Sequence, residues 1–391
     1  MAEISASLRG CYAQPRTRVT SIDVVRGLVM AVMVLDHVRM YLNPCVDPTD
    51  LRMTTPCLFF TRWLTHYCAP SFLLLAGMSA FLGGRNRPKS EQARHLLTRG
   101  LFLIVLEQTW VSMSLSFTYP QAVLATALWA IGWSMLTLAA IIRLPRACIG
   151  GIGLALIAGH NLFDHLHAEG QFFSALWSLL HVRGFRTIAG VPIQLQYPLI
   201  PWVGVMMCGY ALGPVFLQPS HSRQRILLRL GGTTLAGFLM LRYLNLYGDP
   251  EAWHPQVNAI TTAMAFLNCQ KYPPSLLFLL MTLGPVLLAL AAFEHVQGRF
   301  TQPLRLFGQV PLFFYLLQWP LAHGFAVILG RIERYLVPLV SRDSPVGILE
   351  AHENHLDKIY IVWVICVALL YWPCLWYARW SRRFRGSAIV A

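Results

Sequence analysis

One apolar stretch near the N-terminus carries a row of six residues, four of which are polar and include groups suited to proton transfer. These six residues recur at spacings of 3, 4, 3, 4 and 4 residues, which places them on one face of a helix. The set consists of Asp23, Arg26, Met30, Met33, His37 and Tyr41. Imidazole is the usual proton acceptor near neutral pH, and a helical bundle would turn this face inward. We therefore take His37 as the leading catalytic candidate, with its neighbour Asp36, which lies about 100° further round the helix.

Other polar residues lie near the ends of apolar stretches on the side that we expect to face outward. One cavity could gather them around His37, where they would bind an acceptor or stabilise an oxyanion. These candidates are His66, His160, Asn161, Lys271, Tyr272 and His323. Hydrogen-bonded interfacial histidines, and a Lys and Tyr anchor at the membrane surface, are the alternative interpretation.

A second group of candidates lies toward the opposite side. Arg26, Arg94 and Arg99 could hold phosphate groups, because guanidinium pairs well with phosphate. Asp23 lies at the same end of the first stretch as Arg26. Glu107 lies near the middle of the third stretch, where a bare carboxylate is costly, so we expect it to pair with an arginine or to stay protonated, in a structural or functional role.

The composition indicates which elements must position these residues. Hydrophobic residues make up 56% of the 391, and charged residues only 12%, against about 25% in an average globular domain. So few charges cannot cover a soluble surface, and 12 Trp, 21 Phe and 14 Tyr exclude disorder. We therefore predict an all-α, polytopic integral membrane bundle.

Ten stretches have approximately the 20 apolar residues that a membrane-spanning helix needs. They are residues 24–42, 63–82, 96–117, 122–142, 147–162, 197–216, 226–246, 275–293, 304–329 and 359–377. A shorter segment, 172–182, is typical of an amphipathic or re-entrant helix. We assign residues 1–17 to an N-terminal tail, 18–380 to a single transmembrane domain and 381–391 to a C-terminal tail.

The distribution of charge predicts orientation. With the N-terminus inside, 20 of the 31 Lys and Arg residues flank the inner ends of the stretches, and 12 of the 17 Asp and Glu residues fall outside. Both termini are then cytoplasmic. The placement of Lys and Arg at the inner ends explains the net charge of +14. We therefore expect the lipid bilayer, with its anionic headgroups, as a partner, and we expect no binding of nucleic acid.

Cysteine and histidine spacing does not indicate a metal site. The nine cysteines include no CxxC pair and no zinc spacing. Two histidine pairs, His165 with His167 and His352 with His355, have suitable spacing, but they lie in polar loops with no evident third ligand. We predict no metal. Cys45 and Cys57 share an outer loop, and the sequence leaves open whether they form a disulfide.

Several motifs together indicate a family. The segment RVTSIDVVRGL at 18–28, followed by MVLDH at 33–37, closely resembles the opening of bacterial heparan-alpha-glucosaminide N-acetyltransferase family members, within a wider transmembrane acyltransferase superfamily. The resemblance continues through THYCAP at 65–70, WAIGWS at 129–134, GHN at 159–161, YPLIPW at 197–202 and KYPPS at 271–275. It spans roughly residues 18–325.

The resemblance implies a function for the chain. In this family acetyl-CoA is bound from the cytoplasm, and its acyl group passes to an acceptor on the far side, a terminal glucosamine amine for the lysosomal enzyme. A histidine at the end of the first helix is catalytic there, and His37 matches it. For a bacterial chain we expect the inner membrane and a cell-envelope glycan. Direct transfer and an acyl-histidine intermediate stay open, as does the oligomeric state.

One residue departs from the family pattern. Gln318 stands where we expect histidine from the resemblance, which puts activity or substrate preference in question. The alternative function is a secondary transporter that uses buried Asp, Glu and His residues for proton or solute coupling. Such transporters usually contain repeats with matching broken helices, and the sequence has no detectable repeat.

Overall fold

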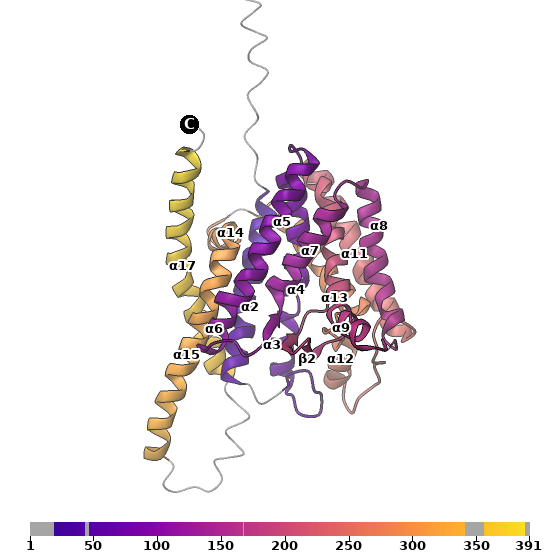
Figure 1. Cartoon of the computed structure of the whole chain (residues 1–391). Helices are drawn as coiled ribbons and strands as arrows, with labels where there is room; N and C mark the ends of the chain where they lie inside the picture. Colours follow the sequence, from indigo (N-terminus) through magenta and orange to yellow (C-terminus); the bar gives the residue numbers. More distant parts are fainter. Residues whose placement is uncertain (1–18, 44–46, 167, 297, 341–355, 388–391) are drawn as a thin grey trace, which may run out of the picture.

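Helices form most of the protein (Figure 1). The computed structural model describes residues 19–43, 47–166, 168–296, 298–340 and 356–387. The first half contains α2 (Thr20–Leu42), α3 (Pro56–Thr65), α4 (Cys68–Gly84), α5 (Lys89–Leu106), η2 (Glu107–Val111), α6 (Ser112–Ser116), α7 (Ala127–Ile141), α8 (Arg146–Gly159), η3 (His160–Phe163) and α9 (Gln171–Leu180). The second half contains α10 (Leu199–Leu212), η4 (Gly213–Leu217), α11 (Ser220–Leu244), α12 (Ala259–Leu267), α13 (Leu276–Ala292), α14 (Thr301–Gln309), α15 (Pro311–Val340) and α17 (Leu356–Ser387).

Six helical segments among the described residues are long and apolar enough to cross a membrane. They are Pro56–Gly84, Lys89–Ser116, Arg146–Phe163, Leu199–Leu217, Pro311–Arg331 and Leu356–Arg383. The α7 and α13 helices are apolar but shorter. All ten predicted stretches contain helix, and the six segments support an integral membrane protein, whereas the full set of ten spans stays a prediction.

The stretch 304–329 is not one helix as predicted. It is divided into α14 and α15 at Val310, whose φ of −126° and ψ of 49° are not helical. The cause is Pro311, which has no N–H to donate and disfavours the helical conformation of the residue before it. The break lets α14 pack against the first turns of α2.

Close backbone contacts bring the central helices together. An added Cβ on Gly77 of α4 would lie 2.1 Å from the carbonyl oxygen of Met206 on α10, and one on Gly209 would lie 2.1 Å from that of Leu74. Gly27 of α2 meets the backbone of Leu304 on α14 in the same way. Small residues at such crossings are typical of membrane helices.

A small sheet lies at the end of the bundle that carries α3, α9 and α12 (Figure 1). β2 (Gly184–Ile188) and β3 (Val191–Leu195) form a hairpin, and β1 (Val123–Ala125) pairs with β3 in parallel. The predicted segment 172–182 is confirmed as helix α9. We did not predict the strands, because the apolar residues of β1 continue directly into α7.

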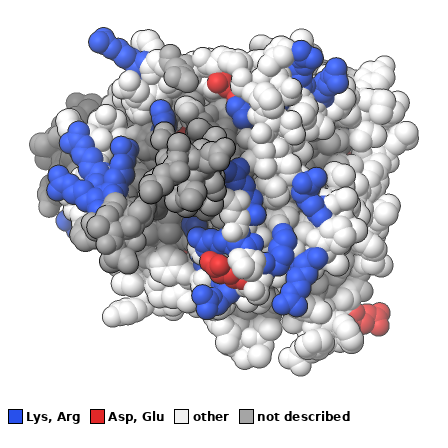
Figure 2. Space-filling model, turned by 90° about the horizontal axis from the view of Figure 1, so that it is seen from above, with Lys and Arg blue, Asp and Glu red and all other residues white. Residues whose placement is uncertain are grey.

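The first residues of α2 and the last turns of α17 lie at the same end of the bundle. Gly308 packs on the backbone of Asp23, and Arg382 donates a hydrogen bond of 3.1 Å to Gln309 in the same region. Figure 2 shows that Lys and Arg side chains gather on this face, with few Asp or Glu among them. We call it the basic end.

Gly77→Ala tests the close contact between α4 and α10. Because the new methyl group would overlap the Met206 carbonyl, we expect a loss of about 1–3 kcal/mol in unfolding free energy. Gly83→Ala is the control, since nothing lies within 4 Å of that position on the same helix. Thermal unfolding of the purified variants in detergent measures both, and equal melting temperatures would contradict this packing.

Candidate active site

The end of the bundle opposite the basic end contains a buried group of charges. Asp36 of α2 accepts hydrogen bonds of 3.3 and 3.1 Å from Nε and Nη2 of Arg39, one helical turn later. Its other carboxylate oxygen accepts from Arg62 of α3. The side chains of Arg39 and Arg62 are only 10% and 12% exposed. The carboxylate is therefore held between two guanidinium groups that come from two helices.

His37 lies beside this group in an aromatic and amide environment. Its ring stacks on that of Trp319 of α15, with 3.7 Å between centroids and 22° between planes. Gln318 is fully buried next to it. Within the described part of the chain, the Nδ1 atom of His37 and both amide atoms of Gln318 are buried without a hydrogen bond of normal geometry.

Three more predicted residues join His37 and Asp36. Lys271, which is only 8% exposed, is close enough to Asp36, His37 and His66 to act on all three electrostatically. Its ammonium lies 5.2 Å from the ring centroid of Tyr272, and the Tyr272 hydroxyl interacts with Arg62. The ring of His66 packs 5.3 Å from that of Phe278. We call Asp36, His37, Arg39, Arg62, His66, Lys271 and Tyr272 the histidine cluster.

Buried Arg242 fixes the loop that carries Lys271 and Tyr272. Its guanidinium donates to the carbonyl oxygens of Glu251, Ala265, Phe266 and Asn268, at distances between 2.9 and 3.1 Å. This satisfies the last carbonyls of α12, which have no helical partner. Asp249 binds the other side of the loop, accepting from Ser275 Oγ at 2.7 Å.

The predicted candidates His160, Asn161 and His323 are not part of the histidine cluster. His160 and Asn161 lie on η3, and the Oδ1 atom of Asn161 accepts the backbone N–H of Leu276 at 2.9 Å. The ring of His323 stacks between those of Tyr41 and Phe117, with centroids 4.8 and 4.0 Å away. Its Nδ1 is 3.1 Å from the carbonyl oxygen of Ser114.

We expected Glu107 to pair with an arginine or to stay protonated, and its hydrogen-bond partners are Thr126 and Leu128. Glu107 lies in the π-helical turn η2 and is fully buried. Its carboxylate accepts from the Thr126 hydroxyl and, at 2.9 Å, from the backbone N–H of Leu128. Both donors lie at the N-terminus of α7, where unpaired N–H groups and the helix dipole favour a negative charge. This contact supports a structural role.

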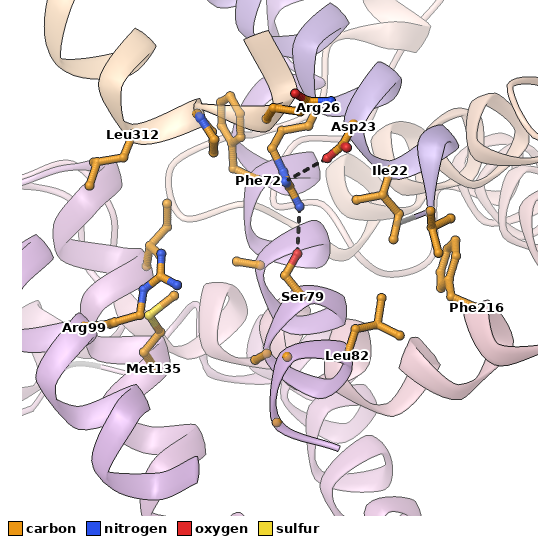
Figure 3. Close-up of a pocket in the computed structure, with 18 of the residues that line it drawn as sticks. Ile22, Asp23, Arg26, Phe72, Ser79, Leu82, Arg99, Met135, Phe216 and Leu312 are labelled. Atoms are coloured by element: carbon orange, nitrogen blue, oxygen red, sulfur yellow. Dashed lines mark hydrogen bonds and ion pairs between the residues drawn. The ribbon is translucent and has the colours of Figure 1, made fainter. Parts of the chain in front are cut away.

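A cavity of about 1070 Å³ opens at the basic end. Its cationic lining residues are Arg26, Arg85, Arg87, Arg99 and Arg223. Arg26 reaches from α2 to Ser79 Oγ on α4 at 2.7 Å and lies 3.7 Å from Asp23, while Arg99 enters from α5 (Figure 3). Arg94, the third predicted phosphate ligand, is exposed and does not line the cavity that the described residues form.

Aromatic rings connect the cavity to the histidine cluster. Met30 lines the cavity, and His37 follows seven residues later on α2, about 10 Å along the helix axis. Tyr315 also lines the cavity, and its ring centroid is 6.2 Å from that of Trp319, which stacks on His37. A long, narrow substrate in the cavity would therefore point toward His37.

The sequence prediction missed Arg39, Arg62 and Arg242. Each is a charged residue within or beside an apolar stretch, which is the signal for a buried, paired group in a membrane protein. Arg39 also follows Asp36 at a spacing of three residues, which favours an ion pair on a helix.

The six helical segments of spanning length within the described ranges fit an integral membrane protein. Residues 18–242 match the family described as heparan-alpha-glucosaminide N-acetyltransferase, catalytic. The match covers more than half of the chain, so the chain belongs to that family, and it is a membrane acetyltransferase. Membership of this family favours the acetyltransferase over the transporter alternative. Comparison with curated proteins gives no match.

Ionisation of Tyr272 tests the electrostatics of the cluster. Burial raises the pKa of this phenol, but Lys271 and Arg62 outweigh it and lower the pKa to about 8. We therefore expect a pH titration of tyrosinate absorbance to show one ionisation near pH 8 in wild type that is missing in Tyr272→Phe. Lys271→Met should move it to higher pH. An ionisation of Tyr272 at or above pH 10 in wild type would contradict these contacts.

Proposed function

We propose that the protein transfers the acetyl group of cytoplasmic acetyl-CoA to an amine or hydroxyl of an extracytoplasmic, glycan-type acceptor. The observation that carries the proposal is the course of α2. This helix lines the cation-rich cavity with Asp23, Arg26 and Met30 and then presents His37 to the buried polar cluster. In a bacterial cell the membrane would be the inner membrane.

The charge of the cavity fits the donor. CoA carries phosphate groups, and guanidinium binds phosphate through paired, charge-assisted hydrogen bonds. Arg26 and Arg99 can contact such groups from two helices. The apolar residues of the lining, which include Phe72 and Met135, suit the pantetheine arm. The thioester would then lie deepest, near Tyr315 and Trp319.

His37 is suited to the proton transfer that acetylation needs. The acceptor nitrogen or oxygen attacks the thioester carbonyl carbon, and a C–N or C–O bond forms as the C–S bond breaks. The acceptor's proton passes to His37, and the departing thiolate takes up a proton as CoA leaves. Positive charge on Lys271, with hydrogen-bond donation from Tyr272, would stabilise the oxyanion that develops on the carbonyl oxygen.

Acetyl-CoA turnover with a panel of amino sugars tests this function. Loss of a general base costs about 10²–10⁴-fold in rate, so His37→Ala should lose turnover by that factor while it remains folded. His254→Ala is the control, because His254 is an exposed loop residue. Equal turnover by wild type and His37→Ala would exclude His37 as the catalytic base, and no turnover in wild type would contradict the proposed donor.

Two arginines on one helix test the donor site. Arg99 lines the cavity and Arg94 does not, although both are exposed residues of α5. A hydrogen bond to a charged group contributes about 1.5–3 kcal/mol, so Arg99→Ala should raise the KM for acetyl-CoA about 10- to 100-fold. Arg94→Ala should leave it unchanged. An equal KM for acetyl-CoA in the two variants would contradict CoA binding in this cavity.

A further inference from the structure

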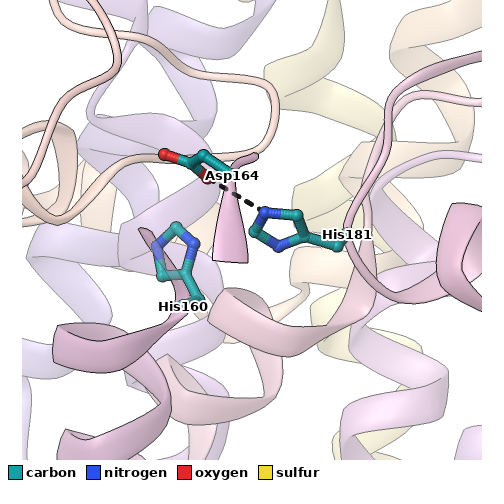
Figure 4. Close-up of side chains that lie close together, drawn as sticks. All are labelled: His160, Asp164 and His181. Atoms are coloured by element: carbon teal, nitrogen blue, oxygen red, sulfur yellow. Dashed lines mark hydrogen bonds and ion pairs between the residues drawn. The ribbon is translucent and has the colours of Figure 1, made fainter. Parts of the chain in front are cut away.

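A second group of polar side chains lies apart from the histidine cluster. His160, Asp164 and His181 converge where α8, η3 and the end of α9 meet (Figure 4). Each offers one potential ligand atom, and these atoms all lie within 4.8 Å of one another. His181 Nε2 is 2.9 Å from Asp164 Oδ1, and the centroids of the two imidazole rings are 5.7 Å apart.

The surroundings of His160 leave its polar atoms without adequate partners. The residue is 1% exposed, and both ring nitrogens are buried. The backbone of Pro274 lies close to the ring, but among the described residues neither nitrogen makes a hydrogen bond of normal geometry. Nδ1 of His181, which is 3% exposed, is likewise buried and unpaired. A buried polar atom without a partner costs about 1–3 kcal/mol, so this arrangement favours a bound ligand.

The carboxylate of Asp164 is already oriented for such a ligand. Its Oδ2 atom accepts a hydrogen bond of 2.9 Å from Asn161, and its Oδ1 atom faces His181. Metal-binding carboxylates commonly have a hydrogen bond of this kind from a neighbouring residue. Asn161 in turn holds the backbone of Leu276, at the start of α13.

We propose that His160, Asp164 and His181 bind a divalent transition-metal ion of the zinc type. Two imidazoles and one carboxylate are ligands that Zn²⁺ accepts, with a fourth position left for water or another ligand. Ligand atoms about 2 Å from a tetrahedral ion lie about 3.3 Å apart, so the present separations require only a small closure. Sequence spacing led us to predict no metal, because these three residues come together only in the fold.

The ion would join segments that are distant in the sequence. It links the end of α8 to the end of α9 and, through Asn161, to α13. The loop with Lys271 and Tyr272 immediately precedes α13, so metal binding would steady two residues of the histidine cluster. The proposal does not depend on the transfer reaction, because metal binding can be measured without turnover.

The test measures metal content and affinity in protein purified with an affinity tag that contains no histidine. Wild type should bind one equivalent of added Zn²⁺, and Co²⁺ in its place should give the visible absorption of a tetrahedral site. Zn²⁺ should raise the melting temperature, and a chelator should reverse that rise. Absence of a bound equivalent in wild type would overturn the proposal without any variant.

Variants test whether these residues are the ligands. His160→Ala and His181→Ala should each weaken Zn²⁺ binding by at least about 100-fold, since even loss of a neighbouring support costs about 10- to 100-fold. Asp164→Asn keeps the size of the side chain and should also weaken binding, which covers the case that an alanine variant does not fold. His254→Ala, in an exposed loop, should bind as wild type does. Unchanged affinity in the folded His160, Asp164 or His181 variants would overturn the assignment.

Discussion

The architecture of the site depends on keeping a carboxylate charged inside an apolar bundle. Asp36 can be buried only because Arg39 and Arg62 surround it, and removal of one member of a buried ion pair costs about 3–5 kcal/mol. This requirement ties α2 to α3 and brings Lys271 toward the same place. His37, the next residue, stacks against Trp319, and its Nδ1 atom is buried without a hydrogen bond of normal geometry among the described residues.

Helix packing determines how the cation-rich cavity and His37 are placed relative to each other. Gly27 and Gly308 allow α14 to lie directly on the backbone of α2, and the Pro311 break lets α15 turn back along α2. Tyr315, which lines the cavity, consequently lies close to Trp319, which stacks on His37. The long polar face of α2 thus has a cation-rich cavity at one end and an imidazole at the other.

Local signals predicted the α2 face and the grouping of His37, His66, Lys271 and Tyr272, because charged residues in apolar stretches must turn inward. The short strands were missed, since apolar runs of a few residues do not distinguish strand from helix. The division of the ninth stretch was missed because hydropathy alone does not register the break before Pro311. His160 was grouped with His37 by depth alone. Its actual neighbours, Asp164 and His181, are brought to it by the fold of a long connection that sequence spacing does not reveal.

The central claim is that the acetyl group passes along α2 from one side of the membrane to the other. Sealed proteoliposomes test it most directly, with labelled acetyl-CoA only outside and an amino-sugar acceptor only inside. We predict labelled acetyl-acceptor in the lumen while CoA stays outside, and loss of that product with His37→Ala. Product that forms only when donor and acceptor share one compartment would contradict the account.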